Sequence, residues 1–190
     1  MAELEADPEF VARREAADAK LAAQAAARAQ SCKPVVADLG SNGVHVESLW
    51  DLYKQPESYP QVIPILLAHL QRDYPESTLE DIGHALPFKP DAVWWGEFKA
   101  LYLTTHSDAV RDRLAAAMSQ CAVRKHYDDL LTFIENEDLG RSRIYFLRPI
   151  NRIGNRLQAG QGRAVIEQLA DHPVLGIEST RILQGRSRSQ

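Results

Sequence analysis

The sequence lacks the signatures of membrane, secreted and metal-binding proteins. No apolar run approaches the roughly 20 residues that a membrane-spanning helix needs, and the acidic N-terminus, MAELEADPEF, has no apolar core of the kind found in secretory signals. Only two cysteines occur, Cys32 and Cys121, far apart and in no metal-ligand spacing. We interpret both as reduced thiols, with Cys121 as a small core residue. These absences predict a cytoplasmic protein with no membrane segment.

Motifs that carry catalysis or bind cofactors are also missing. The chain has no GxxxxGK[ST], no GxGxxG after a strand, no HExxH and no CxxC. The six histidines are scattered, and the nearest approach to a polar constellation is His126 with Asp128 and Asp129. These acids begin a helical segment, where they favour the positive end of the helix dipole, so we prefer helix capping to a metal or catalytic role. We therefore expect no enzyme activity, no catalytic residue, no metal and no cofactor.

What the chain does contain is a recurring pair of amphipathic helices, first seen in Pro60–Leu86. Its first helix has apolar residues at i, i+3, i+4 and i+7. Similar pairs recur with a period of about 32–35 residues, which is typical of an α-solenoid whose helical pairs bury their apolar faces against each other. A bundle of four to eight helices of similar length is the alternative. The repeated first-helix positions are Ile63, Leu66, Leu67 and Leu70; Trp95, Phe98 and Tyr102; Tyr127, Leu130, Leu131 and Ile134; and Val165, Ile166 and Leu169. Those of the second helices are Ile82, Leu114 and Phe146, together with Leu86, Met118, Ile150 and Ile182.

The N-terminal third differs from the repeats. Alanine dominates from about Pro8 to Gln30, which favours a helix, yet few large apolar side chains lie on it, so we expect a weakly packed arm. Pro34 disfavours helix at the preceding residue and predicts a break. Val44–Lys54 is expected to be a short amphipathic helix that caps the first repeat. The expected organisation is an arm over 1–33, a capping segment over 34–58, repeats over 59–184 and a basic tail over 185–190.

Local signals mark where the repeat helices begin. Ser77 followed by Glu80 forms the pattern of a capping box. Asp91 is expected to cap the next helix, and Ser107 to cap a helix over Asp108–Cys121.

The sixth repeat helix is expected over Arg141–Ile153, with Pro149 in its interior. A proline there should kink the helix, at a cost of about 3 kcal/mol.

The helical pairs, with small residues in the second helix (IGHAL, RLAAAM), resemble HEAT repeats over roughly Tyr59–Leu183. VESLWDLYKQPESYPQVIPILLAHL followed by IGHAL is similar to small bacterial HEAT-repeat proteins that lack an assigned activity. The resemblance implies an all-α fold, a HEAT-like α-solenoid of about four helical pairs with an N-terminal helical arm. It also implies a scaffold that binds protein or nucleic acid rather than a catalyst.

Charge is distributed unevenly along the chain. The formal net charge is −4, but residues 139–190 contain nine arginines, no lysine and three acids, so this part carries +6 and the first 138 residues carry −10. Such a division suggests that the C-terminal part meets something acidic. The alternative is internal balance between the two ends of the molecule.

The arginines of the sixth helix supply a candidate binding surface. If Phe146, Ile150 and Ile153 face the core, the arginines of this helix project from the opposite side. The 32-residue step then aligns Asp81, Arg113, Tyr145 and Ile177 in one ridge, and His84, Ala116, Arg148 and Thr180 in another. HEAT-like solenoids turn their second helices inward, so the resemblance implies that these ridges line the concave face. Arginine there offers bidentate donors for carboxylate or phosphate; a merely solvated helix face is the alternative. The candidate binding residues are His84, Arg113, Arg141, Tyr145, Arg148 and Arg152.

Two functions remain open at this point. The first is a protein-binding scaffold, adaptor or inhibitor/immunity-type partner that uses this face against a protein with an acidic patch. The second is a nucleic-acid-binding protein, including the DNA glycosylases that use HEAT-like repeats. That function needs a broadly basic groove with a catalytic acid and aromatic rings, and a pI near 5.9 disfavours it.

Overall fold

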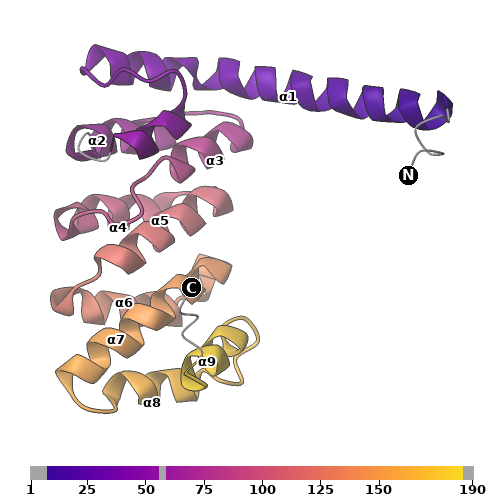
Figure 1. The fold of residues 1–190 in the computed structure, drawn as a ribbon. Helices are drawn as coiled ribbons and strands as arrows, with labels where there is room; N and C mark the ends of the chain where they lie inside the picture. Colours follow the sequence, from indigo (N-terminus) through magenta and orange to yellow (C-terminus); the bar gives the residue numbers. More distant parts are fainter. Residues whose placement is uncertain (1–7, 56–58, 186–190) are drawn as a thin grey trace.

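The computed structural model describes residues 8–55 and 59–185, and every regular element within them is helical (Figure 1). The helices lie in successive layers, from α1 at one end to α8 and α9 at the other. In chain order the elements, with η marking 3₁₀ helices, are α1 (Pro8–Ser41), η2 (Leu49–Lys54), α2 (Tyr59–Leu70), α3 (Glu76–His84), η4 (Ala92–Trp94), α4 (Trp95–Thr104), α5 (Asp108–Cys121), η5 (Arg124–His126), α6 (Tyr127–Glu135), η6 (Glu137–Phe146), α7 (Leu147–Leu157), α8 (Gln161–Gln168) and α9 (Gly176–Leu183).

Each layer packs on the next. The second helices form one column, in which α3 contacts α5, α5 contacts α7 and α7 contacts α9. At the other end, α2 lies between α1 and α4. The expectation of an all-α fold is confirmed for the described residues. None of the helices in this part of the chain is both long and apolar enough to cross a membrane.

The apolar positions that define the sequence repeat form the core. The stripe on α2 is buried along its whole length, and its counterparts on α4, α5, α6 and α7 are buried as well. Periodicity therefore identified most of the inward positions, but Leu131, Val165, Leu169 and Ile182 are only partly buried. The buried set includes Ile63, Leu66, Leu67, Leu70, Phe98, Tyr102, Leu114, Met118, Leu130, Ile134, Phe146 and Ile150.

An aromatic cluster holds the middle layers together. The rings of Tyr102, Phe133 and Phe146 lie with centroids 5.1–5.4 Å apart. Beside them, Trp95 stacks on His126 at 4.0 Å, and its indole nitrogen donates to Asp129 over 2.9 Å. Offset and edge-to-face ring pairs add about 0.5–1.5 kcal/mol each beyond their buried area. This cluster joins α4, α6 and η6 into one unit.

The first helix corrects the break that was expected at Pro34. α1 continues through Pro34 without the break expected over 31–42. Apart from the partly buried Phe10, residues 9–27 are exposed, whereas Cys32, Val35 and Leu39 are buried against the stack. Burying an aliphatic side chain contributes about 1.5–3 kcal/mol, and two such residues offset the about 3 kcal/mol that a proline costs in a helix. Figure 1 shows the result: the second half of α1 covers the end of the stack and its first half projects beyond it.

Two hydrogen-bonded clusters fix α1 to the second layer. Arg28 donates to Asp81 over 2.7 Å and also pairs with Glu80 at 3.3 Å. Further along, the fully buried His69 lies 2.8 Å from Asp38 through Nε2 and 2.8 Å from the Tyr74 hydroxyl through Nδ1. Because a carboxylate only accepts, Nε2 carries the proton and Nδ1 accepts from Tyr74.

Helix starts were predicted with mixed success. Ser107 caps α5 through a 3.1 Å bond from the Val110 amide, and Asp91 caps η4 through a 3.0 Å bond from the Val93 amide. Both assignments are confirmed. Ser77 does not cap α3, which starts at Glu76, so the capping-box assignment was wrong.

The short helix expected over Val44–Lys54 is also corrected. It is reduced to the 3₁₀ helix η2, which buries Leu49 and Leu52 and leaves Trp50 and Tyr53 exposed. The expected basic tail, beyond residue 185, lies outside the described residues.

The expected sixth helix is divided in two. Gly140, at φ +58°, interrupts η6, and an α-helix begins only at Leu147. Pro149 is therefore the third residue of α7, where the backbone N–H has no partner inside the helix. The proline is accommodated without the kink that an interior position would produce.

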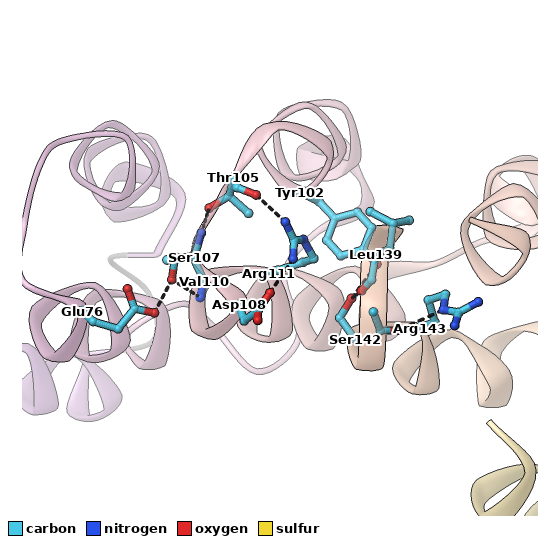
Figure 2. Close-up of polar contacts among 11 residues, drawn as sticks. Glu76, Tyr102, Thr105, Ser107, Asp108, Val110, Arg111, Leu139, Ser142 and Arg143 are labelled. Atoms are coloured by element: carbon cyan, nitrogen blue, oxygen red, sulfur yellow. Dashed lines mark hydrogen bonds and ion pairs between the residues drawn. The ribbon is translucent and has the colours of Figure 1, made fainter. Parts of the chain in front are cut away.

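Side-chain bonds stabilise the irregular segment before α7 (Figure 2). Arg143 donates to the carbonyls of Gly140 and Ile134, both over 2.9 Å. Ser142 donates to the Leu139 carbonyl over 2.7 Å, so the Tyr102 hydroxyl, 2.8 Å away, is the donor to Ser142. On the other side of α5, Ser107 donates to Glu76 over 2.6 Å, and Arg111 to the Thr105 carbonyl over 2.6 Å. The bonds from Ser142 and Arg143 therefore hold the segment that precedes α7, and those from Ser107 and Arg111 hold the start of α5.

Two glycines set the crossing of α7 and α8. A Cβ on Gly154 would lie 2.6 Å from the Cα of Gly162 and 2.6 Å from the hydroxyl oxygen of Tyr127. A Cβ on Gly162 would lie 2.5 Å from the carbonyl oxygen of Asn151. Carbon atoms in contact normally lie about 3.5–4.0 Å apart. The two helices therefore touch through their backbones, which only glycine allows.

Candidate functional site

A groove runs along the column of second helices. Its largest part, a basic hollow of about 960 Å³, lies between α5, α7 and α9. A middle hollow of about 260 Å³ adjoins it through Ser119, Gln120 and Tyr145. An apolar hollow of about 580 Å³ adjoins the middle one through Tyr53, Pro87 and Phe88. The three hollows share walls and form one continuous surface, which we call the groove.

The groove gathers five of the six residues expected at a binding face. His84 and Arg113 line the middle hollow, Tyr145 lies at its junction with the basic hollow, and Arg148 and Arg152 line the basic hollow. The sixth, Arg141, is exposed and lines none of the three; it lies near Asp112, whose pKa burial raises and Arg141 lowers in part.

The ridges derived from the 32-residue step hold only between α3 and α7, and there with one exception: Asp81 lines none of the three hollows and instead accepts from Arg28. Ile177 and Thr180 line a separate hollow of about 420 Å³ at the end of the stack. Of the described residues, only Arg181 borders both that hollow and the groove.

An internal carboxylate pairs with the arginines of the basic hollow. Arg148 donates through Nε and Nη2 to one oxygen of Glu178, over 3.0 and 2.8 Å. The other Glu178 oxygen lies 3.5 Å from Arg181. Arg152 instead donates to the Ala122 carbonyl over 3.1 Å. Arg148 and Arg152 are thus held in place, with their guanidinium groups still exposed.

Aromatic side chains form the opposite end of the groove. Trp50 packs near Tyr53 and His84, with centroids 6.0 and 5.9 Å away, and the Tyr53 hydroxyl donates to the His84 carbonyl. Burial, and secondarily the charge of Arg113, lower the pKa of His84. Trp50 remains 57% exposed and Phe88 72% exposed. Large exposed rings grouped around a hollow mark an interaction site more strongly than scattered ones do.

The charge of the groove is positive overall. Of the residues that the structure describes, five cations line it, against the two carboxylates of Glu178 and Asp91. Among the described residues, no carboxylate lies within ion-pair distance of Lys89 or Arg113. The five cations are Lys89, Arg113, Arg148, Arg152 and Arg181.

Sequence reasoning missed several residues of the groove. Lys89 and Phe88 lie in the connection between α3 and η4, which no helical ridge includes. Tyr53 was expected on the apolar side of a capping helix but faces the groove. The signal that could have found them is the cluster of proline and aromatic residues in LPFKPDAVWW.

Outside the groove, His126 and Asp129 have structural partners, and Cys121 is buried. His126 accepts from the Val123 amide over 3.3 Å. Burial alone would raise the pKa of Asp129, but the bonds from Lys99 and Trp95 outweigh it and place the pKa below its ordinary value. Burial raises the pKa of Cys121 to about 11, which keeps this thiol protonated and unreactive near neutral pH. Residues 8–55 and 59–185 contain no group of three or more His, Cys, Asp or Glu placed to hold a metal ion.

A groove with exposed rings at one end and fixed guanidinium groups at the other can bind a ligand through apolar contacts with the rings and ion pairs with the guanidinium groups. Comparison of the chain with protein-family models, curated proteins and solved structures finds no significant match, so the account rests on the chain's own residues.

Proposed function

We propose that this chain is a non-enzymatic, cytoplasmic protein-binding scaffold, an adaptor or inhibitor-type partner, built as a HEAT-like solenoid that binds through the groove. The observation that carries the proposal is the juxtaposition of exposed aromatic rings with five cations along one face. Protein interfaces concentrate aromatic residues and arginine, whose planar donors suit partner carboxylates. The stacked layers and the periodic apolar stripes support the solenoid architecture.

Nucleic acid is the competing ligand, because arginines also bind phosphate. The groove offers it a poorer match, since Glu178 lies among the arginines and the chain carries a formal charge of −4. The test below separates the two.

The experiment is capture of partners from native lysate at low salt, with and without nuclease, by the full chain and by two double variants. Arg148→Glu with Arg152→Glu inverts the charge of the groove; Arg124→Glu with Arg156→Glu makes the same charge change at exposed positions outside it. The proposal predicts a stoichiometric protein, insensitive to nuclease, retained by the second variant and lost with the first. Equal capture by both variants, or nucleic acid as the only ligand, would refute it.

A further inference from the structure

The shape of the groove indicates what kind of segment it holds, an inference that rests on the proposed function and deepens it. The middle hollow, of about 260 Å³, is the smallest of the three and joins the two larger ones, and an extended chain has a smaller cross-section than a helix, whose diameter with side chains is about 10–12 Å. It therefore suits an extended chain better than a helix.

The length of the groove sets the length of that segment. The groove follows the column α3, α5, α7 and α9, and three helix-to-helix steps of about 9 Å each span about 27 Å. An extended chain of about eight residues covers that distance.

The apolar hollow suits a proline or an aromatic residue. Its walls combine the rings of Tyr53, Tyr59, Phe88 and Trp94 with prolines at 60, 87 and 90. Such ring-lined hollows bind proline-rich and aromatic segments, and a wall that contains proline loses little conformational entropy when it is covered. Phe88 has much apolar surface that such a ligand would bury, because 72% of its surface is exposed in the free protein.

The basic hollow suits carboxylates. Four cations line it: Lys89, Arg148, Arg152 and Arg181. Glu178, the one carboxylate among the described residues that line it, accepts hydrogen bonds from Arg148 in the way that an acidic side chain of a ligand would. Arg148 holds that carboxylate through two of its nitrogens, the kind of geometry that distinguishes arginine from lysine. An acidic side chain of a ligand would compete with Glu178 for the same guanidinium.

We propose that the groove binds an extended acidic segment of a partner protein, with a proline or aromatic anchor in the apolar hollow and carboxylates on Arg148, Arg152 and Arg181. Charge distinguishes this occupant from the chain's own C-terminal residues, which follow Gly185 at the edge of the groove and contain two arginines and no acid.

Glu178 then acts as an internal competitor. Exposed ion pairs contribute about 0–1 kcal/mol, so removing the charge of Glu178 should tighten the binding of an acidic ligand by up to about fivefold. A merely solvated ion pair predicts no such gain. The direction of this effect separates a ligand-binding arginine from a structural one.

The test selects random 12-residue displayed peptides against the full chain and measures the enriched peptide by fluorescence anisotropy. We expect enriched sequences with clustered Asp or Glu and a proline or aromatic residue to one side. Glu178→Gln should tighten binding. Arg148→Gln with Arg152→Gln should weaken it at least tenfold, as should Phe88→Ala, while Arg124→Gln with Arg156→Gln leaves it unchanged. These variants alter exposed or half-buried side chains. Circular dichroism of each variant is the control for folding.

Several outcomes would overturn the inference. The first two are no enrichment and enrichment of basic peptides. The third is tighter binding of a 20-base-pair DNA duplex at the same residues. The fourth is self-association that disappears when the acidic residues 1–7 (MAELEAD) are deleted, because the occupant would then be a second copy of this chain. If peptides fail while lysate capture of an intact protein still depends on Arg148 and Arg152, the proposed function stands and only the extended acidic segment is refuted.

Discussion

The contact between Gly154 and Gly162 makes a quantitative prediction about stability. Alanine in place of a helical glycine normally stabilises a protein by about 0.5–1 kcal/mol through helix propensity and the unfolded chain. At Gly154, however, the new Cβ would meet the Gly162 Cα at 2.6 Å, about 1 Å inside normal contact. Because the backbone of α8 must move, we take the upper part of the 1–3 kcal/mol range for overpacking, which leaves a net loss of about 2 kcal/mol.

The matched control is Gly96→Ala, in the first turn of α4, where a Cβ meets no atom within 4 Å. The same substitution should therefore have opposite signs at the two positions. Urea unfolding followed by circular dichroism should show a small gain for Gly96→Ala. For Gly154→Ala we expect a fall in the melting temperature of about 4–8 °C, from about 2–4 °C per kcal/mol for a chain of this size. A Gly154→Ala variant as stable as the wild type would show that the glycines do not set the α7–α8 crossing.

Three further perturbations test other parts of the fold. Burial lowers the pKa of His69 and His126 below its ordinary value of 6.5. The unfolded chain then binds protons that the folded one does not, so stability should fall as pH drops below 6.5, by at most about 1 kcal/mol per histidine between pH 7 and 5.5. Urea midpoints that do not change over this range would contradict the assignment. Pro149→Ala should change stability by less than about 1 kcal/mol, against a gain of about 3 if the proline lay in a helix interior, as chemical unfolding will show. Deleting residues 1–27 should leave the melting temperature unchanged because residues 9–27, apart from the partly buried Phe10, are exposed, whereas Leu39→Ala should lower the free energy of unfolding by about 2–5 kcal/mol. A large loss from the deletion would mean that the projecting half of α1 packs.

Local sequence signals predicted the parts of the fold that depend on nearest neighbours. The stripe on α2 follows from helical periodicity alone, and the caps at Asp91 and Ser107 act within three residues. Pro34 was misjudged because its local cost is outweighed by the packing of Val35 and Leu39. That packing depends on residues from a different layer, which local signals do not include.

The candidate site could be predicted only in part, for the same reason. The 32-residue step placed His84, Arg113, Tyr145 and Arg148 along one face, and the outward side of the sixth helix added Arg152. Arg148 and Glu178 are 30 residues apart in the sequence. Their pairing depends on the crossing of α7 and α8, where Gly154 and Gly162 meet. The apolar hollow depends on an irregular connection, which has no period to follow.

The central claim is that a partner protein covers the groove, and site-specific photo-crosslinking in native lysate tests it most directly. A benzoylphenylalanine is placed at Phe88 or Tyr145, both in the groove, or at Leu103 or Val174, exposed positions that line none of its three hollows. The account predicts one protein adduct from the first two positions, abolished by Arg148→Glu with Arg152→Glu, and none from the other two. The same adducts from all four positions, or none from Phe88 and Tyr145, would contradict it.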